Sequence, residues 1–412
     1  MNLLRFTTAG SVDDGKSTLI GRLLFDSKSV FIDQMESVEK TSHRKGLDTI
    51  DFSLLTDGLK DEREQGITID VAYRYFSTPK RKFIIADTPG HIQYTRNMVT
   101  GASTADAALI IIDARHGVVE QTRRHSFIAG LLGIPSLLVC INKMDLVDFE
   151  KKIFDNVVSD FKKIMDSSNI ESVNFIPISA LLGDNVVEKS ENMSWYKGYT
   201  LLNHLETIEI DDSRYLQEFR MPIQSVIRPH LDKYHDYRGY SGRVSSGTIS
   251  QGDTIVALPS QNSSTVKSIY CGDVLINKAY SGQSIAIELN DDIDISRGDT
   301  LANKNSLNIE SIFDATICWL DNERQREGSK YSLRQGTNEV KCMIQEVSGI
   351  LNIHSLDFEP SNDGLVPNGI GKVRIKTTKN IVYDSYTKNR VTGSFILIDE
   401  NSGSTVAAGM IS

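Results

Sequence analysis

One segment near the start of the chain limits the possible folds more than any other. Residues 10–17 read Gly-Ser-Val-Asp-Asp-Gly-Lys-Ser and fit the pattern G-x-x-x-x-G-K-[ST]. In this pattern the glycines let backbone N–H groups turn inward onto phosphates, the lysine reaches the terminal phosphates, and the hydroxyl binds Mg²⁺. The pattern predicts a phosphate-binding loop that consists of Gly10, Ser11, Val12, Asp13, Asp14, Gly15, Lys16, Ser17 and Thr18.

The neighbours of this segment fit the surroundings that such a loop needs. A phosphate loop leaves a buried strand and opens a helix whose N-terminus faces the anion. We expect the strand at residues 3–9 and the helix at residues 18–24, where apolar residues recur at helical spacing. A glycine-rich turn that only joins a strand to a helix is the alternative at this point.

The composition argues against several classes of protein. Of the 412 residues, 40% are hydrophobic and 24% are charged, and no apolar run approaches the roughly 20 residues that span a bilayer. The formal net charge of −9 argues against nucleic-acid binding, which usually depends on a basic surface. We therefore expect neither a membrane span nor a nucleic-acid partner. A chain of this length predicts two or three domains.

The cysteines and the first residues indicate the compartment. The four cysteines form no C-x-x-C pair, so neither a zinc site nor a disulfide framework is expected; they are Cys140, Cys271, Cys318 and Cys342. The chain starts directly with the predicted strand and shows no signal-peptide pattern. We expect a cytoplasmic protein.

The chain divides into two parts that differ in the pattern of their apolar residues and glycines. Up to about residue 212, strand-length apolar runs alternate with helical periodicity, which predicts a mostly parallel sheet covered by helices. Further strands are expected at residues 82–86, 107–112, 136–141 and 174–178. The rest is β-rich and punctuated by glycine, as in barrels or sandwiches, with a break near residues 302–310. We predict a multidomain α/β plus all-β fold with domains at 1–212, 213–305 and 306–412.

Two further motifs follow predicted strands. The segment Asp87, Thr88, Pro89 and Gly90 comes after the strand at 82–86, where the aspartate can hold Mg²⁺ through water and the Gly90 amide can reach a γ-phosphate. His91 comes next and can orient an attacking water, although a lone histidine is usually structural. Thr68, in the sequence Gly-Ile-Thr-Ile at 66–69, can bring a hydroxyl to the metal, or it can belong to an edge strand.

The base of the nucleotide is predicted by two other segments. Asn142, Lys143, Met144 and Asp145 follow the strand at 136–141, and Ser179, Ala180 and Leu181 follow the strand at 174–178. A carboxylate can accept two hydrogen bonds from the N1–H and the exocyclic amine of guanine, a pattern that adenine lacks, so Asp145 favours GTP over ATP. The alternative is a polar helix cap.

Together these elements resemble translational-type GTPases, in which a P-loop GTP-binding domain precedes two β-barrels and a histidine follows the D-x-P-G motif. Several stretches extend the resemblance, over essentially the whole chain, to the GTPase (large) subunit of bacterial heterodimeric sulfate adenylyltransferase. These stretches are residues 55–70, 87–103, 113–127, 238–242 and 389–396. One departure is Ile92, where the family usually has an acidic residue.

The resemblance implies a specific activity. In that family the subunit hydrolyses GTP, while a separate smaller subunit forms adenosine 5′-phosphosulfate and pyrophosphate from ATP and sulfate. It implies that Ser17, Thr68 and Asp87 bind Mg²⁺ and that His91, Lys16 and Thr68 serve catalysis. It also implies that Val12 and Ile67 flank the histidine. The alternatives are a translation factor that carries aminoacyl-tRNA and a GTP-regulated scaffold that barely hydrolyses nucleotide.

The two adjacent carboxylates of the phosphate loop remain unexplained by the motif. Two negative charges beside bound phosphates repel unless a cation or the backbone geometry turns them away. We expect Asp13 to face a cation or the amides of the loop.

Overall fold

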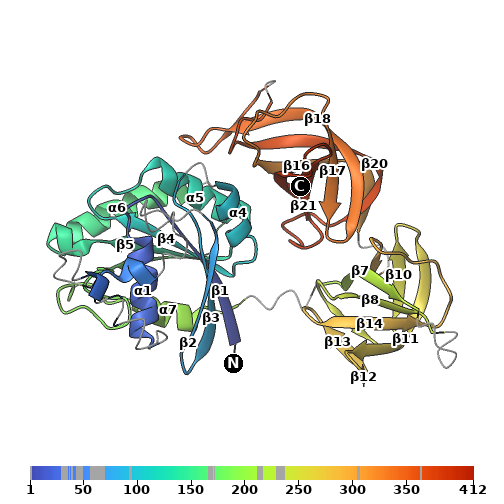
Figure 1. Cartoon of the computed structure of the whole chain (residues 1–412), viewed down its shortest axis with the longest axis horizontal. Helices are drawn as coiled ribbons and strands as arrows, with labels where there is room; N and C mark the ends of the chain where they lie inside the picture. Colours follow the sequence, from blue (N-terminus) through green and yellow to red (C-terminus); the bar gives the residue numbers. More distant parts are fainter. Residues whose placement is uncertain are drawn as a thin grey trace. The chain divides into compact units, whose positions relative to one another are not determined.

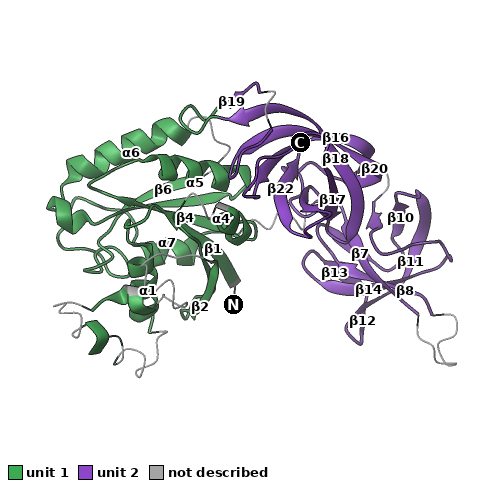
Figure 2. Cartoon of the chain, turned by 45° about the horizontal axis from the view of Figure 1, so that its top comes forward, with its two compact units in different colours: residues 1–210, 352–357 green, residues 211–351, 358–412 purple. Residues whose placement is uncertain are grey.

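The computed structural model of the chain forms two compact units. One unit consists of residues 1–210 and 352–357, and the other consists of residues 211–351 and 358–412 (Figure 2). The structure describes residues 2–28, 36, 38, 40–42, 50–55, 70–91, 95–165, 170, 172–210, 217–228, 237–303, 307–361 and 364–412. The three domain limits that the sequence suggests stay a prediction.

A six-stranded sheet forms the centre of the first unit (Figure 1). The strand order is β2-β3-β1-β4-β5-β6, and all neighbouring pairs are parallel except β2 with β3. The strands are β1 (Asn2–Gly10), β2 (Ala72–Ser77), β3 (Arg81–Asp87), β4 (Ala107–Asp113), β5 (Ser136–Asn142) and β6 (Ser172–Pro177). The strands that the sequence predicts for this sheet are confirmed, with limits that shift by one or two residues.

Helices accompany this sheet. They are α1 (Lys16–Asp26), α4 (Thr95–Ala102), α5 (Glu120–Leu131), α6 (Lys151–Met165) and α7 (Leu201–Thr207), with short 3₁₀ turns at η1 (Phe52–Leu55) and η3 (Met144–Val147). Within the described part of the chain, no helix has the length and apolar character needed to cross a membrane.

The core of this unit explains why its strands read as apolar runs. Every residue of β4 and β5 is buried, as expected where helices cover both faces of a parallel sheet. Side chains of β1 and α1, such as Phe6 and Leu19, pack into one cluster with Leu109 and Leu138. Each fully buried side chain of this size contributes about 1.5–3 kcal/mol. This core holds the loops at the strand ends in place.

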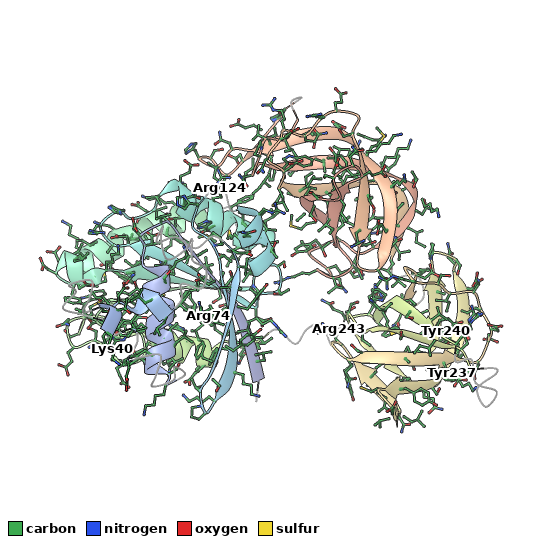
Figure 3. The ribbon with its side chains drawn as sticks, viewed as in Figure 1. Lys40, Arg74, Arg124, Tyr237, Tyr240 and Arg243 are labelled. Carbon is green, nitrogen blue, oxygen red and sulfur yellow. The ribbon has the colours of Figure 1, made fainter. Side chains whose placement is uncertain are left out.

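The second unit contains two closed β-barrels (Figure 1). The first barrel follows the order β10-β15-β7-β8-β14-β11 and closes through β10 and β11. Its strands are β7 (Arg220–Ile227), β8 (Gly239–Arg243), β10 (Thr254–Leu258), β11 (Asn262–Cys271), β14 (Ser284–Leu289) and β15 (Thr300–Ala302). The short strands β9 (Thr248–Ser250), β12 (Val274–Ile276) and β13 (Lys278–Tyr280) accompany it. Tyr240 lies in its core, and its hydroxyl donates to the Ile293 carbonyl at 2.9 Å (Figure 3).

The second barrel follows the order β17-β21-β22-β16-β20-β18 and closes through β17 and β18. Its strands are β16 (Asn308–Trp319), β17 (Lys330–Gln335), β18 (Asn338–Leu351), β20 (Ile370–Tyr383), β21 (Ser394–Asp399) and β22 (Thr405–Ile411), with β19 (Phe358–Glu359) added beside β18. Closure leaves no open sheet edge in either ring. The sequence prediction of a mostly parallel α/β domain followed by two barrels is confirmed.

A buried ion pair joins the two barrels. Arg220 of β7 is 1% exposed, and its guanidinium donates to Asp384, which follows β20, at 3.1 and 3.2 Å. The Thr392 hydroxyl donates to the same carboxylate at 2.7 Å, and Glu218 accepts another Arg220 hydrogen at 2.9 Å. Because both charges are buried, the loss of either partner removes the main compensation of the other.

We expect Asp384→Asn to destabilise the second unit by about 3 kcal/mol, since breaking a buried pair from one side carries a cost of that size. The two tryptophans fall in different units, Trp195 in the first and Trp319 in the second. Urea unfolding followed by Trp319 fluorescence in a Trp195→Phe background measures the loss. The exposed pair of Lys341 and Glu400 offers the control, because Lys341→Ala there changes the unfolding free energy by less than about 1 kcal/mol.

Candidate functional site

The phosphate loop lies where the sequence places it, between the end of β1 and the start of α1. Gly15 has φ +93°, which glycine adopts easily, and a Cβ there would lie 2.5 Å from Nδ2 of Asn142. The loop therefore needs glycine at this position both for its backbone conformation and for close packing. Thr18, which the prediction includes, lies in the first turn of α1.

The charges within the loop are buried to different degrees. The Asp14 side chain is buried, and its carboxylate accepts the Ser11 N–H at 2.6 Å. Burial raises the pKa of Asp14 although this hydrogen bond opposes the shift, and burial lowers the pKa of Lys16 although nearby carboxylates oppose it. The Lys16 ammonium is thus buried among carboxylates.

Of the two partners expected for Asp13, the loop amide binds Asp14 instead, and a cation at Asp13 stays a prediction. Asp14 binds the loop amide, while Asp13 is exposed and contributes its backbone carbonyl, which accepts a hydrogen bond from the Lys143 ammonium. Asp13 has φ +66°, which lies in the left-handed region, and in this conformation its carbonyl accepts the hydrogen bond from Lys143. The Asp14 carboxylate is thus buried against the loop, whereas Asp13 is exposed.

The Asp87 to Gly90 segment meets the phosphate loop. Asp87 is the last residue of β3, is buried, and accepts the Thr8 hydroxyl at 3.0 Å. Thr88 is also buried and donates its hydroxyl to the Thr8 carbonyl. A Cβ at Gly90 would lie 2.5 Å from the Gly10 carbonyl oxygen and 2.9 Å from Nζ of Lys16. Pro89, between Thr88 and Gly90, is buried as well.

Two other predicted residues complete this part of the site, and one falls outside it. His91 follows Gly90 and is half-buried, and Ser17 is half-buried in the first turn of α1. Thr68 lies outside the described residues, as do its neighbours in the Gly-Ile-Thr-Ile sequence.

The base-reading segments meet the loop through one side chain. Asn142, the last residue of β5, donates from Nδ2 to the Asp14 carbonyl at 2.8 Å and accepts the Ala180 N–H on Oδ1 at 2.9 Å. Its neighbour Lys143 reaches Asp13, as described above. One asparagine amide thus ties the phosphate loop to both segments.

The remaining residues of these segments line the same edge of the sheet. Met144 and Ser179 are buried, and Leu181 is exposed. Oδ1 of Asp145 is buried and, within the described chain, has no hydrogen-bond partner. An unpaired buried acceptor is costly, and a ligand that carries two neighbouring N–H donors, such as guanine, satisfies it. The donor and acceptor chemistry of this edge fits a guanine nucleotide.

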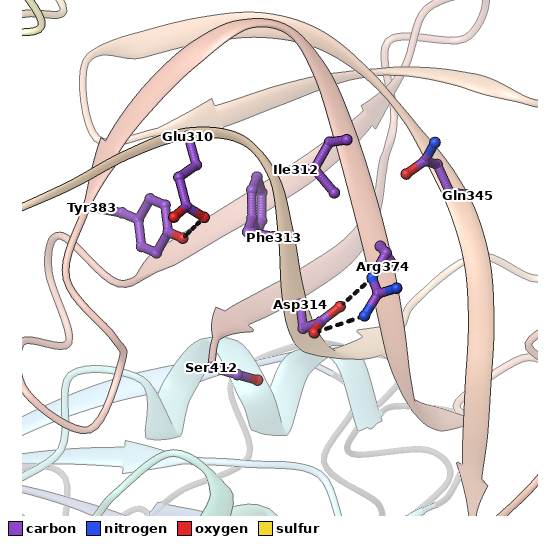
Figure 4. A pocket seen from close by; sticks show the side chains of 8 residues that line it. All are labelled: Glu310, Ile312, Phe313, Asp314, Gln345, Arg374, Tyr383 and Ser412. Carbon is purple, nitrogen blue, oxygen red and sulfur yellow. Dashed lines mark hydrogen bonds and ion pairs between the residues drawn. The ribbon is translucent and has the colours of Figure 1, made fainter.

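The second barrel also carries a cavity. Its volume is about 590 Å³, and it is lined by Glu310, Ile312, Phe313, Asp314, Gln345, Arg374, Tyr383 and Ser412 (Figure 4). Its carboxylates already have partners: Asp314 accepts from Arg374 at 2.8 and 3.2 Å, and Glu310 accepts from Tyr383 at 2.9 Å. None of the predicted site residues lines this cavity.

Comparison with known proteins decides the family. Residues 1–215 match the family described as elongation factor Tu GTP binding domain, and residues 312–412 match the GTP-eEF1A C-terminal domain-like family. The sulfate adenylyltransferase subunit 1 of Bacteroides thetaiotaomicron is 49% identical over 100% of this chain and 86% of its own length. That of Aliarcobacter butzleri is 51% identical over 99% and 87% of the two chains. The bifunctional enzyme CysN/CysC of Mycobacterium tuberculosis is 50% identical over 99% and 67%.

The chain belongs to the sulfate adenylyltransferase subunit 1 family. Members of this family are translational-type GTPase subunits, and this membership agrees with the resemblance that the sequence motifs carry. A GTP-binding domain is present, so GTP is the nucleotide of this site.

Two buried groups lie beside this site, and sequence reasoning missed the first of them. Asp113, at the end of β4, contacts Lys143 at 3.0 Å. The second group is His125 of α5, which packs in the interior: its side chain is buried, and its Nδ1 has no partner among the described residues. Burial and the positive charges of Lys16 and Arg124 lower the pKa of His125 to about 3. An acidic residue at the end of a buried strand was the available signal for Asp113.

The lowered pKa of His125 predicts a pH dependence of stability. Between pH 6.5 and pH 3 the unfolded chain binds a proton at this position and the folded chain does not, so stability is complete above pH 6.5 and falls as the pH decreases. In His125→Phe, the loss of unfolding free energy between pH 7 and pH 5 is expected to be smaller by about 2 kcal/mol. Urea unfolding followed by Trp195 in a Trp319→Phe background measures it. An equal loss in both proteins contradicts the prediction, and the exposed His354→Phe serves as control.

Proposed function

We propose that this chain binds and hydrolyses GTP as the large subunit of a sulfate adenylyltransferase. One observation carries the proposal: the phosphate loop, Gly90 and the base-reading residue Asn142 meet at one edge of the sheet. The membership of the chain in a family whose relatives are named sulfate adenylyltransferase subunit 1 supports the reaction in which hydrolysis takes part.

The proposed roles follow the chemistry of each segment. Residues 10–18 bind the phosphates through backbone N–H groups and the Lys16 ammonium. Residues 87–91 bind at the γ-phosphate, where the Gly90 amide lies beside Lys16. Asp145 accepts hydrogen bonds from guanine, and the Lys143 stem lies along the base. The other base-site residues in the proposal are Asn142, Met144, Ser179, Ala180 and Leu181.

We also propose a Mg²⁺ ion held by Ser17, Thr68 and, through water, Asp87. The Ser17 hydroxyl and the Asp87 carboxylate are hard oxygen donors, which Mg²⁺ prefers, and Asp87 is already oriented by the Thr8 hydroxyl. The ion supplies charge neutralisation on the β- and γ-phosphate oxygens. Thr68 is outside the described residues, so its part rests on the sequence.

In the proposed reaction His91 orients a water molecule for attack on the γ-phosphorus. The bond from the γ-phosphorus to the bridging oxygen of GDP breaks as the water oxygen bonds to phosphorus, and phosphate and GDP leave. Lys16 and the backbone amides stabilise the charge that spreads over the phosphoryl oxygens. Hydrolysis by the chain alone is expected to be slow and to become faster when the partner subunit binds.

The proposed partner is a smaller adenylyl-transferring subunit, which joins ATP and sulfate. Its product, adenosine 5′-phosphosulfate, is a mixed anhydride whose formation is unfavourable, and GTP hydrolysis drives it. The name subunit 1 of the relatives supports a partner chain. All four cysteines are free thiols, which favours a reducing compartment such as the cytoplasm.

The alternatives differ in partner and in turnover. An aminoacyl-tRNA carrier has to attract a polyanion, and the net charge of −9 opposes this. A regulated scaffold binds GTP with little hydrolysis, and a substitution at His91 separates it from an enzyme.

His91→Ala is expected to lower the rate constant of GTP hydrolysis at least about 100-fold, because the water loses its positioning group. The Kd for GTP stays within about threefold, since binding depends on the phosphate and base contacts. Phosphate release at saturating GTP and equilibrium titration with a fluorescent GTP analogue measure the two quantities. His354→Ala leaves both unchanged, and unaltered turnover in His91→Ala supports the scaffold instead.

Coupling is tested with the purified chain and its presumed smaller subunit. Formation of adenosine 5′-phosphosulfate from ATP and sulfate is expected to increase with GTP and to lose this dependence when His91→Ala replaces the native chain. A non-hydrolysable GTP analogue separates binding from hydrolysis. Product formation that is independent of GTP would contradict the proposal. Tight, GTP-dependent binding of aminoacyl-tRNA would support the translation-factor alternative instead.

A further inference from the structure

Asp113 is a buried carboxylate for which the proposed function assigns no role. It is the last residue of β4, its side chain is 1% exposed, and it lies beside Asn142 in the register of β4 and β5. An isolated carboxylate at such a depth is strongly disfavoured, so the groups that face it decide what it does. In the sheet order its strand lies between β1, which leads into the phosphate loop, and β5, which leads into the base-reading segment.

Two cationic side chains pair with this carboxylate. Arg115 donates from its backbone N–H at 2.9 Å and from its guanidinium at 3.0 and 2.7 Å. Nζ of Lys143 lies 3.0 Å from Oδ2. Burial acts to raise the pKa of Asp113, but the hydrogen bonds from Arg115 and Lys143 outweigh it and hold the pKa well below its usual range. The carboxylate is therefore charged at neutral pH.

Lys143 connects this carboxylate to the phosphate loop. Its ammonium also donates to the Asp13 carbonyl, and its stem passes Gly15, whose added Cβ would lie 4.0 Å from Cε. An ammonium has three hydrogens and can serve both acceptors at once. One contact lies at the end of β4 and the other on the phosphate loop after β1, so Lys143 joins both to the end of β5.

Arg115 extends the same group of charges toward the base. The hydrogen bonds and charge of Asp113, and to a smaller extent the charge of Asp145, raise the pKa of Arg115. The guanidinium is partly exposed, whereas the carboxylate beneath it is not. Asp113 is thus the buried centre of a cluster whose outer members, Arg115 and Lys143, are more exposed.

We infer that Asp113 is a positioning residue for the guanine nucleotide: it holds the Lys143 ammonium against the Asp13 carbonyl and so fixes the base-reading segment to the phosphate loop. The inference rests on the proposed function, because it concerns how long that site retains its ligand. It assigns Asp113 to nucleotide release and leaves the chemical step to other residues.

The test measures GDP dissociation from the full-length chain. Asp113→Asn keeps the shape and one acceptor oxygen but removes the charge, and it is expected to release a fluorescent GDP analogue about tenfold faster, since loss of one member of a buried charge pair acts mainly on dissociation. Hydrolysis of bound GTP in a single turnover stays within about twofold, because residues at the γ-phosphate are unchanged. Asp106→Asn, at the opposite end of β4, is the matched control and releases at the native rate.

A double-mutant cycle with Lys143→Met separates positioning from general support of the fold. If Asp113 acts through Lys143, the double variant releases GDP no faster than Lys143→Met alone. Additive effects, or native release by Asp113→Asn, overturn the inference. Should Asp113→Asn fail to fold, Asp113→Glu keeps the charge but displaces it by one methylene, and native release by that variant also overturns it. A native chain that binds no guanine nucleotide overturns the proposed function itself, which is a separate outcome.

Discussion

The site depends on the two hydrogen bonds of one amide, the side chain of Asn142. It donates to the Asp14 carbonyl and accepts the Ala180 N–H, so three segments far apart in the sequence share one fixed geometry. The bond is buried, where competition from water is weak and an unmade partner is costly. Position 15 requires glycine because the Asn142 amide occupies the space that a Cβ would need there. The contact of Lys143 with the Asp13 carbonyl adds a second link between the same loop and the segment after β5.

The parallel sheet makes this geometry possible. Because β1, β3, β4, β5 and β6 run in the same direction, their carboxyl ends meet at one edge, and each end contributes a polar residue or a loop. The apolar interiors of β4 and β5 keep these ends from shifting. The same rule governs buried charge in both units: Asp113 is paired with two cations, and Arg220 is paired with Asp384.

Much of the fold, and the position of the candidate site's described motifs at the sheet edge, could be predicted from particular residues. Buried parallel strands are nearly continuous apolar runs, so the strands that end near Ala86, Ile112 and Ile141 were visible in the sequence, and the motifs that follow them were placed correctly at the sheet edge. Asp13 and Asp14 could not be told apart, because two adjacent residues of one type differ only in which side chain the folded loop buries. The pairing of Arg220 with Asp384, 164 positions apart, carries no local pattern.

By itself, the sequence determined the type of chemistry and the order of the elements, because phosphate and guanine recognition require certain residue types at short, fixed spacings. Tertiary structure alone decided which of those residues touch. The contacts of Asp113 with Lys143, of Asn142 with Asp14 and of Gly90 with Lys16 join positions on different strands and loops. Such contacts depend on strand register and on burial that lowers the local dielectric. The spacing of residues within one motif predicts neither of these.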